Sequence, residues 1–370
     1  MKILSFQPCS LYQNGGMGRL LRRLYQGHEV DITGLYIDDD KFSLKHGDIN
    51  EIAIHSFPLK RSWMRWKLRP LFTWLRESLF YNITKNKVKK AVAKLPFDVL
   101  HVINHGVYST ILCDEIFLNK KQLWTSFHDH YSLCSSFKDA QLLWNRSDRR
   151  LMISAELGEE YVRLFGYKKF EIITDGVSLE EISRPKQISK DRISIYFAGL
   201  MHIDYYPLLE VLADSLDILV SQGYSFKFIL RGTQEIYFLK TRKFEIDYRS
   251  EFISDEEIKK ELDMADILYL PIKFSLPDFY LYSLSTKMIS YLGASGSILF
   301  HGPSDSAACN LLTENKSAFC CVSLSKEEMT SLIKEMLSMD ESICVNAKNL
   351  AKSNFDLNYI QNAFWKNNRL

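Results

Sequence analysis

Short apolar runs alternate with longer amphipathic segments along this chain of 370 residues, and this alternation constrains its fold more than any other feature. Parallel strands need a crossover connection, which is usually a helix, so strand–helix alternation predicts parallel sheets. In the first half we expect strands at residues 2–6, 31–37, 52–57, 99–102, 123–127, 151–154 and 170–173. Helices are expected there at residues 18–26, 88–95 and 155–165.

The alternation restarts after a polar stretch that contains Pro185. Strands are expected at residues 194–198, 226–231, 267–271 and 297–301, and helices at residues 207–222, 255–265, 286–293, 326–339 and 341–353. The restart predicts an α/β protein with two Rossmann-like domains, residues 1–184 and 188–353, that face a cleft. A last helix, about residues 355–370, is expected to pack back on the first domain. Ligands of such sheets bind outside the carboxyl ends of the strands.

Composition narrows the class of protein. The chain is 46% hydrophobic and 25% charged, as in globular proteins, and its net charge of +2 argues against a nucleic-acid binder. Seven cysteines without a CxxC pair predict a reducing compartment and no disulfide framework. The first residues are typical of a strand and not of a signal peptide, and no apolar run approaches ~20 residues. We therefore expect a cytoplasmic protein.

A glycine-rich turn, Asn14-Gly15-Gly16-Met17-Gly18, follows the first expected strand and opens a helix. Glycines let the backbone approach a ligand, and a helix N-terminus offers free N–H groups to an anion. The spacing differs from GxGxxG, so a dinucleotide fingerprint is not indicated.

Histidines gather near two strand ends. His128-Asp129-His130 follows the strand at residues 123–127, where a histidine can bind a hydroxyl group or stabilise developing charge. A structural loop histidine is the alternative. His101 and His105 raise the further alternative of a zinc or iron site. A second acidic ligand motif is missing, so we expect no metal.

Ser285-Thr286-Lys287 begins the helix expected at residues 286–293. Serine and threonine cap helix N-termini, and a capped N-terminus with a lysine in its first turn predicts a diphosphate site. Lysine in a first turn opposes the helix dipole, which makes a structural role harder to argue. An ordinary capped helix is the alternative.

Residues 60–94 hold eleven lysines or arginines and one acid, Glu77, interleaved with aromatic residues. Basic residues attract anionic lipids and aromatic residues favour the interface, so we expect contact with an anionic membrane surface. RNA binding by the same charges, or a solvated basic face over buried aromatics, is the alternative. The residues assigned to membrane or acceptor are Arg61, Trp63, Arg65, Trp66, Lys67, Arg69 and Trp74.

The order of these motifs resembles the bacterial GT-B glycosyltransferases of glycosyltransferase family 4. The resemblance covers nearly the whole chain. It is carried by Gly15-Gly16-Met17-Gly18-Arg19, His128-Asp129, Asp175-Gly176-Val177, Gly199-Leu200, Ser285-Thr286-Lys287 and His301-Gly302-Pro303. It implies a GT-B fold and a retaining, metal-independent transfer of a sugar from a nucleotide-diphosphate sugar. The implied acceptor is a lipid-linked or growing glycan of a bacterial surface polysaccharide, bound by the N-terminal domain.

The resemblance also implies roles for single residues. Gly15 and Gly16 would face the donor phosphates through backbone N–H groups, and His128, followed by Asp129, would contact the transferred sugar. Ser285, Thr286 and Lys287 would hold the diphosphate. The donor-binding positions are then Gly15, Gly16, Gly199, Arg231, Tyr282, Ser285, Thr286, Lys287 and Ser290.

The sequence departs from the family at charged positions. Leu200 and Tyr205 stand where the family often has a diphosphate-clamping arginine and lysine, and Tyr282 and Ser290 replace its paired glutamates. Lys287, Arg231 or Lys273 could compensate for the lost clamp. Two alternatives stay open: a catalytically degenerate GT-B partner protein, and a metal-dependent hydrolase that uses His101, His105, His128 and His130.

Overall fold

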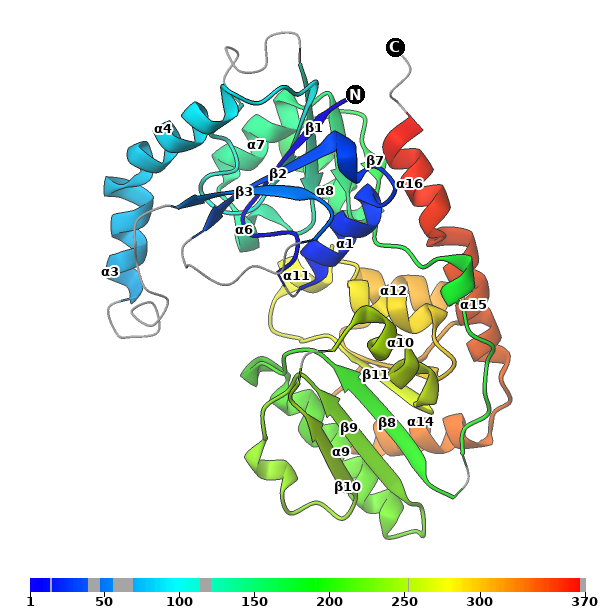
Figure 1. The fold of residues 1–370 in the computed structure, drawn as a ribbon. Coiled ribbons are helices and arrows are strands. Elements are labelled where there is room, and N and C mark those ends of the chain that lie inside the picture. Colours follow the sequence, from blue (N-terminus) through cyan, green and yellow to red (C-terminus); the bar gives the residue numbers. More distant parts are fainter. Residues whose placement is uncertain are drawn as a thin grey trace. The chain divides into compact units, whose positions relative to one another are not determined.

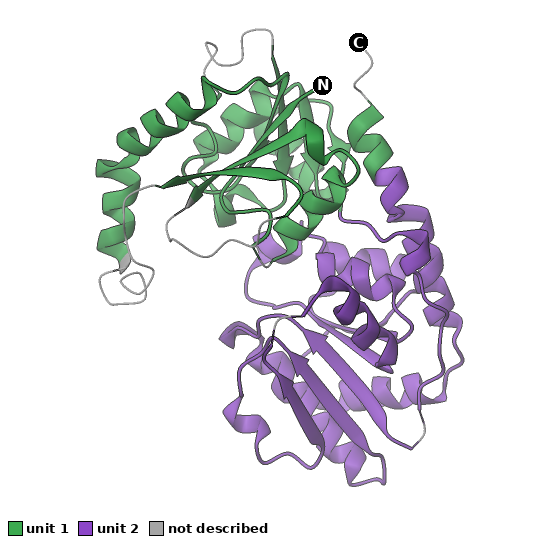
Figure 2. Ribbon diagram, viewed as in Figure 1, with its two compact units in different colours: residues 1–174, 361–370 green, residues 175–360 purple. Residues whose placement is uncertain are grey.

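The computed structural model describes residues 1–13, 15–38, 47–55, 69–113, 121–189, 191–251 and 253–366 (Figure 1). The chain forms two compact units (Figure 2). Unit 1 is residues 1–174 with residues 361–370, and unit 2 is residues 175–360. Residues 183–187, the polar stretch after which the strand–helix alternation restarts, belong to unit 2 in this division.

Unit 1 is built on a sheet of seven parallel strands in the order β3-β2-β1-β4-β5-β6-β7. The strands are β1 (Ile3–Gln7), β2 (Ile32–Asp38), β3 (Asn50–His55), β4 (Val99–Ile103), β5 (Gln122–Phe127), β6 (Arg149–Met152) and β7 (Glu171–Ile172). The order 3-2-1-4-5-6 is that of the Rossmann fold, which confirms the expected fold class for this half. Strands β1 and β4 are buried along their whole length, as a sheet covered on both faces requires.

The helices of unit 1 lie between these strands. They are α1 (Gly16–Tyr25), η1 (Glu29–Asp31), α3 (Arg69–Trp74), the π-helix η2 (Leu75–Leu79), α4 (Tyr81–Val92), α6 (Tyr131–Cys134), α7 (Phe137–Arg146) and α8 (Ala155–Phe165). The final helix α16 (Leu357–Trp365) reaches unit 1 with its last turns. There the indole of Trp365 donates to the carbonyl of Leu24 at 2.8 Å. The guanidinium of Arg149 donates to the carbonyl of Phe364 at 2.6 Å.

Unit 2 is a second parallel sheet, in the order β10-β9-β8-β11-β12-β13, which confirms two Rossmann-like sheets. Its strands are β8 (Ile193–Ala198), β9 (Phe226–Arg231), β10 (Glu245–Arg249), β11 (Ile267–Pro271), β12 (Ser297–His301) and β13 (Phe319–Cys321). Its helices are η3 (Leu179–Glu181), η4 (Ile203–Tyr205), α9 (Tyr206–Val220), η5 (Tyr237–Leu239), α10 (Asp255–Met264), α11 (Pro277–Tyr280), α12 (Thr286–Gly293), α13 (Ala307–Glu314), α14 (Lys326–Ser338) and α15 (Ser342–Asn354).

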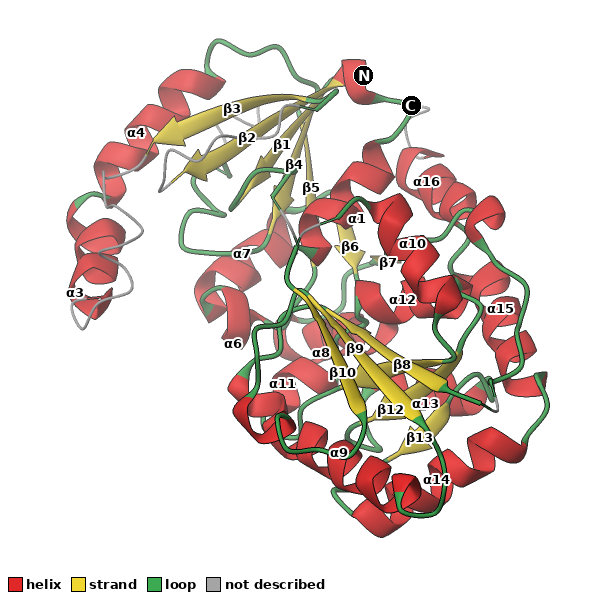
Figure 3. Cartoon of the chain, turned by 60° about the horizontal axis from the view of Figure 1, so that its bottom comes forward, coloured by secondary structure: helices red, strands yellow, loops and turns green. Residues whose placement is uncertain are grey.

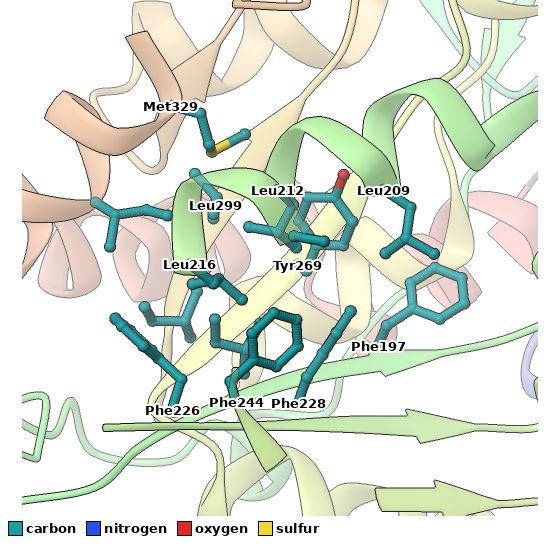
Figure 4. Close-up of a cluster of buried hydrophobic side chains, with 14 of the residues drawn as sticks. Phe197, Leu209, Leu212, Leu216, Phe226, Phe228, Phe244, Tyr269, Leu299 and Met329 are labelled. Atoms are coloured by element: carbon teal, nitrogen blue, oxygen red, sulfur yellow. The ribbon is translucent and has the colours of Figure 1, made fainter. Parts of the chain in front are cut away.

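Helices cover both faces of the unit 2 sheet (Figure 3). On one face α9 packs over the strands, and Leu212, Phe228 and Tyr269 are fully buried between them (Figure 4). On the other face α12 and α15 bury Ile289, Leu292 and neighbouring side chains. The helices on both faces hold the strands of this sheet in position. The loops that carry polar side chains begin at the ends of these strands. No helix in the described part of the chain is long and apolar enough to span a bilayer.

Candidate functional site

Lys287 lies at the carboxyl edge of the unit 2 sheet, in the first turn of α12. The side chain of Ser285 caps this helix by accepting from the N–H of Met288 at 3.2 Å. The ammonium of Lys287 lies 3.8 Å from the centre of the Phe197 ring, at the end of β8. Gly199 follows with a φ of +132°, and a Cβ there would lie 3.2 Å from the Lys287 nitrogen. Glycine at this position therefore keeps the space beside the ammonium open.

The environment of Lys287 makes its charge sensitive to an anion. Burial lowers its pKa from 10.5 to about 7, and no charged group contributes to that shift. Within the described residues no carboxylate forms an ion pair with Lys287, and its contact is the face of an aromatic ring. An anion placed beside the ammonium would favour the charged form and raise the pKa. Lys287 thus has the properties of an oxyanion-binding lysine.

Arg231 and Lys273, the other two cations expected to compensate for the missing clamp, already have acidic partners. Arg231 donates to Glu261 at 3.0 Å, and Arg249 donates to the same carboxylate at 2.7 Å. Lys273 pairs with Asp204 at 3.1 Å. Since these charges are matched within the fold, Lys287 is the stronger candidate for a phosphate contact, and the donor-binding role of Arg231 stays a prediction.

Three further predicted donor positions lie on or just before α12. Thr286 is the first residue of this helix, and its carbonyl accepts from the Ser290 hydroxyl at 3.0 Å. Tyr282 lies in the connection between α11 and α12 and is half-buried. Tyr282 and Ser290 supply hydroxyl groups where the family has carboxylates, so a sugar or ribose contact by either stays a prediction.

In unit 1, the glycine-rich turn joins β1 to α1. Asn14 lies outside the described residues, Gly15 is the N-cap with a φ of +150°, and Gly16 begins the helix. Within the described residues, no side chain caps this N-terminus, and no acid lies in its first turn. A Cβ on Gly18 would lie 2.6 Å from the carbonyl of Leu11, so only glycine allows this close approach.

The turn is fastened to β3 by one carboxylate. Glu51 accepts hydrogen bonds from Gln7 at 3.0 Å, from the Ser10 hydroxyl at 2.6 Å and from the Leu11 N–H at 2.8 Å. The sequence offered no signal for this role, because Glu51 lies about forty residues from its partners. Three donors on one carboxylate hold the turn in a defined position.

His128 follows β5 and is half-buried, and its Nδ1 has no hydrogen-bond partner among the described residues. Burial, and next the neighbouring His105, lower its pKa to about 4. The ring is therefore neutral near pH 7 and can accept or donate one hydrogen bond. Asp129 comes next in the chain, and its carbonyl accepts from the thiol of Cys134 at 3.7 Å. Their catalytic roles stay predictions.

In the described part of the chain, His101, His105 and His130 do not form the metal site considered as an alternative. Both ring nitrogens of His101 are engaged, with the Tyr25 hydroxyl at 2.6 Å and the Ser126 hydroxyl at 2.8 Å. Burial, and then His128, lower the pKa of His101 to about 3. Within the described ranges, no group of three His, Cys, Asp or Glu side chains is arranged to hold a metal ion. His101 is a buried link from β4 to α1 and β5. His130 bonds Ser132 at 2.8 Å.

A cavity of about 460 Å³ lies at the carboxyl ends of β1 and β4 in unit 1. It is lined by Phe6, Gln7, Pro8, Ile37, Arg76, Glu77, Ile103, His105, Gly106, Val107, Tyr108, Ser109, Ser132, Leu133, Cys134, Ser135 and Ser136. Sequence reasoning missed all of these except His105. What could have predicted these residues is their position in the sequence, because most of them lie in the loops that directly follow β1, β4 and β5.

The basic, aromatic segment is described only from its second part. Arg61, Trp63, Arg65, Trp66 and Lys67 lie outside the described residues. Arg69 begins α3, and Trp74 ends it with 61% of its surface exposed. An exposed tryptophan on this helix is compatible with the predicted membrane or acceptor contact.

Comparison with solved structures identifies the architecture. Anabaena HepE in complex with UDP superposes with a TM-score of 0.69 at 14% identity, covering 99% of both chains. The N-terminal domain of the Candida albicans trehalose-6-phosphate phosphatase superposes with a TM-score of 0.68 at 12% identity, covering 99% of this chain and 96% of that one. The Burkholderia xenovorans trehalose-phosphate synthase, in complex with glucose-6-phosphate, superposes with a TM-score of 0.65 at 12% identity, covering 99% of both chains.

The chain has the GT-B glycosyltransferase fold. No protein-family model matches the sequence, and no curated protein matches it either. Membership of glycosyltransferase family 4 therefore stays an expectation. The GT-B fold defines where in its sheet each strand-end loop described above lies.

Proposed function

We propose that this GT-B protein is a glycosyltransferase that moves a sugar from a nucleotide-diphosphate sugar to a lipid-linked or growing glycan acceptor. The observation that carries the proposal is Lys287, an ammonium without an acidic partner in the described residues, beside the open backbone of Gly199. A cation at the carboxyl edge of a parallel sheet suits a diphosphate leaving group. Structures of HepE with UDP-glucose, and with UDP and glucose, support the donor class by similarity of fold.

In this proposal the chemistry needs no metal and is retaining, as in the family that the sequence resembles. Lys287 and the N–H groups of α12, with Ser285 and Thr286, stabilise the charge that develops on the leaving diphosphate. His128, neutral near pH 7, would bind a hydroxyl of the transferred sugar. Catalysis then rests on positioning and electrostatic stabilisation.

The proposed place of the reaction is the inner face of the bacterial cell membrane, in the synthesis of a surface polysaccharide. Support comes from the lysines of α4 and from the exposed apolar side chains of α3 and α4, which suit an anionic membrane surface. The protein would bind there peripherally from the cytoplasmic side.

Calorimetric titration with a set of nucleoside diphosphates tests the donor site. We expect micromolar binding of at least one of them, and a loss of roughly 10- to 100-fold in Lys287→Ala. Lys334→Ala, which removes an exposed lysine of α14, is the matched control and should bind as the natural protein does. Failure of every nucleotide to bind would refute the proposal.

One observation favours the alternative of a catalytically degenerate partner protein. Tyr282 and Ser290 replace the family's carboxylates, and Leu200 and Tyr205 replace its clamp. A partner protein could still bind the nucleotide, so binding alone does not separate the two functions. Sugar transfer that survives Lys287→Ala and His128→Ala in cells would favour the partner protein.

A further inference from the structure

Two cysteine side chains of unit 2 lie against the same threonine. Cys309 is in the first turn of α13, and Cys320 is the middle residue of β13. Their sulfur atoms lie 3.8 Å and 3.7 Å from the hydroxyl oxygen of Thr313, near the end of α13. The helix, the turn at residues 315–318 and the strand that follows it therefore bring the two thiols to one hydroxyl group.

The two thiols also change each other's proton affinity. A hydrogen bond with the Cys320 thiol is the first cause that lowers the pKa of Cys309, and the Thr313 hydroxyl adds to this shift. The same bond, and next burial, raise the pKa of Cys320. One thiol of the pair thus keeps its proton and stabilises the other as a thiolate. The thiolate is the form of cysteine that attacks an oxidant.

The neighbouring thiols of unit 2 lie outside this pair. Cys321 follows Cys320 on β13, and side chains alternate along a strand, so its sulfur lies on the opposite face. There it donates to the carbonyl of Ser323 at 3.6 Å, and burial raises its pKa to about 11. The thiol of Cys344 donates to the carbonyl of Ser295 at 3.1 Å. Cys321 is therefore protonated near neutral pH and is a control within the same strand.

The pair lies directly beneath the protein surface. Cys309 is 3% exposed, Cys320 is partly buried, and Thr313, which contacts both sulfur atoms, is exposed. A small uncharged oxidant such as hydrogen peroxide can reach such a site, where thiolate character and access together set the rate. All seven cysteines of the chain are free thiols. In a reducing compartment, disulfides that do form are transient.

We propose that Cys309 and Cys320 form a peroxide-sensitive dithiol that is oxidised to a disulfide within unit 2. The thiolate attacks one oxygen of hydrogen peroxide, the O–O bond breaks, hydroxide leaves and a sulfenic acid remains. The second thiol then attacks the sulfenic sulfur, so that the S–S bond forms and water leaves. Two electrons pass from the sulfur atoms to the peroxide, and two thiols and one peroxide give one disulfide and two water molecules.

This modification site is independent of the proposed function. The disulfide would close residues 309–320 into a ring around the turn in which Lys316 has a φ of +48°. A ring of this kind restricts the unfolded chain and opposes local opening. Hydrogen exchange in α13 should therefore be roughly 5- to 100-fold slower in the oxidised protein than in the reduced protein.

Peroxide treatment of the full chain, followed by alkylation of the remaining thiols and peptide mass spectrometry, tests the site. Trypsin cleaves after Lys316 and so places the two cysteines in separate peptides, residues 288–316 and 317–326. The expected product is a disulfide between these two peptides. It should form roughly 10-fold or more faster in the native protein than in concentrated urea, because the fold holds the thiols together. Dithiothreitol should remove it by thiol–disulfide exchange and become a cyclic disulfide.

Four variants assign the sulfur atoms. Cys309→Ser and Cys320→Ser should each abolish the link between the peptides, whereas Cys321→Ser should keep it. Thr313→Val preserves the shape of the side chain without its hydroxyl group and should slow the oxidation by roughly 3- to 10-fold. Cys320→Ala repeats the test without a new polar group, in case serine disturbs the packing of β13.

Several results would overturn the inference. One is a native protein in which peroxide oxidises a single cysteine to sulfinic acid without linking the peptides. Another is a link that persists in Cys320→Ser and Cys320→Ala, since Cys321 would then be the partner. Equal rates of linking in the native and the urea-unfolded protein would show that the fold does not prepare the pair.

Discussion

The packing around the Lys287 ammonium determines whether this group carries its proton near neutral pH, and that proton can be measured. Burial against Phe197 disfavours the charged form, and burial is the cause of its pKa of about 7. Sequence reasoning found this residue through the Ser285-Thr286-Lys287 pattern. It could not foresee that Arg231 and Lys273 would be neutralised by Glu261 and Asp204, because those partners lie thirty and sixty-nine residues away.

Nucleoside diphosphate binding should therefore take up a proton at Lys287. The folded pKa of about 7 lies below the usual value, so the free protein loses the charge as pH rises through 7, while the bound diphosphate favours it. Affinity should fall as pH rises from 6.5 to 8.5. Titration calorimetry at pH 8 in buffers of different ionisation enthalpy should report an uptake near one proton.

Lys287→Arg provides the control for this proton, because arginine stays charged at these pH values. The variant should show little uptake and a flatter pH dependence, even if its affinity is lower. Equal proton uptake by the variant and the natural protein would assign the proton to another group.

At the scale of elements, the sequence predicted the buried parallel strands well, since an apolar run bounded by polar residues marks them. It missed β10, whose residues Glu245, Asp247 and Arg249 are charged. β10 lies at the sheet edge, where Asp247 pairs with Lys227 and Arg249. It also missed β13, which has only three residues. The π-turn was missed because a search for apolar residues at the helical period does not detect a single inserted residue.

Insertion of one alanine after Ser78 tests the role of that turn. The inserted residue should rotate Leu71 and Trp74 away from Leu79 and Ile83, because α4 is fixed by its buried face and the π-turn already accommodates one extra residue. Sedimentation with anionic phospholipid vesicles should show binding reduced by roughly 5- to 50-fold. Ser78→Ala keeps the length of the helix and should bind as before. Equal binding by both variants would show that the exposed side chains of Leu71, Trp74, Leu79 and Ile83 do not contact the membrane.

At the scale of the whole molecule, the chain crosses between its units twice, after residue 174 and after residue 360. The second crossing completes the core of unit 1. Phe364 is fully buried there against Trp124 and Tyr25, at ring-centre distances of 5.4 and 5.9 Å. Arg149 stacks on Trp124 at 4.4 Å and also bonds the carbonyl of Phe364. Unit 1 thus depends on residues far along the chain, although its sheet is complete within its first 174 residues.

Phe364→Ala should therefore destabilise unit 1 selectively, by about 3–5 kcal/mol, because it opens a cavity beside β4 and β5. Hydrogen exchange should accelerate in β4, β5 and α1, while β8, β9 and β11 of unit 2 keep their protection. Tyr359→Ala, at a residue of α16 that is 70% exposed, is the control and should leave both units unchanged. Equal loss of protection in both units would mean that they unfold as one cooperative body. The C-terminal residues would then stabilise the whole molecule and not unit 1 alone.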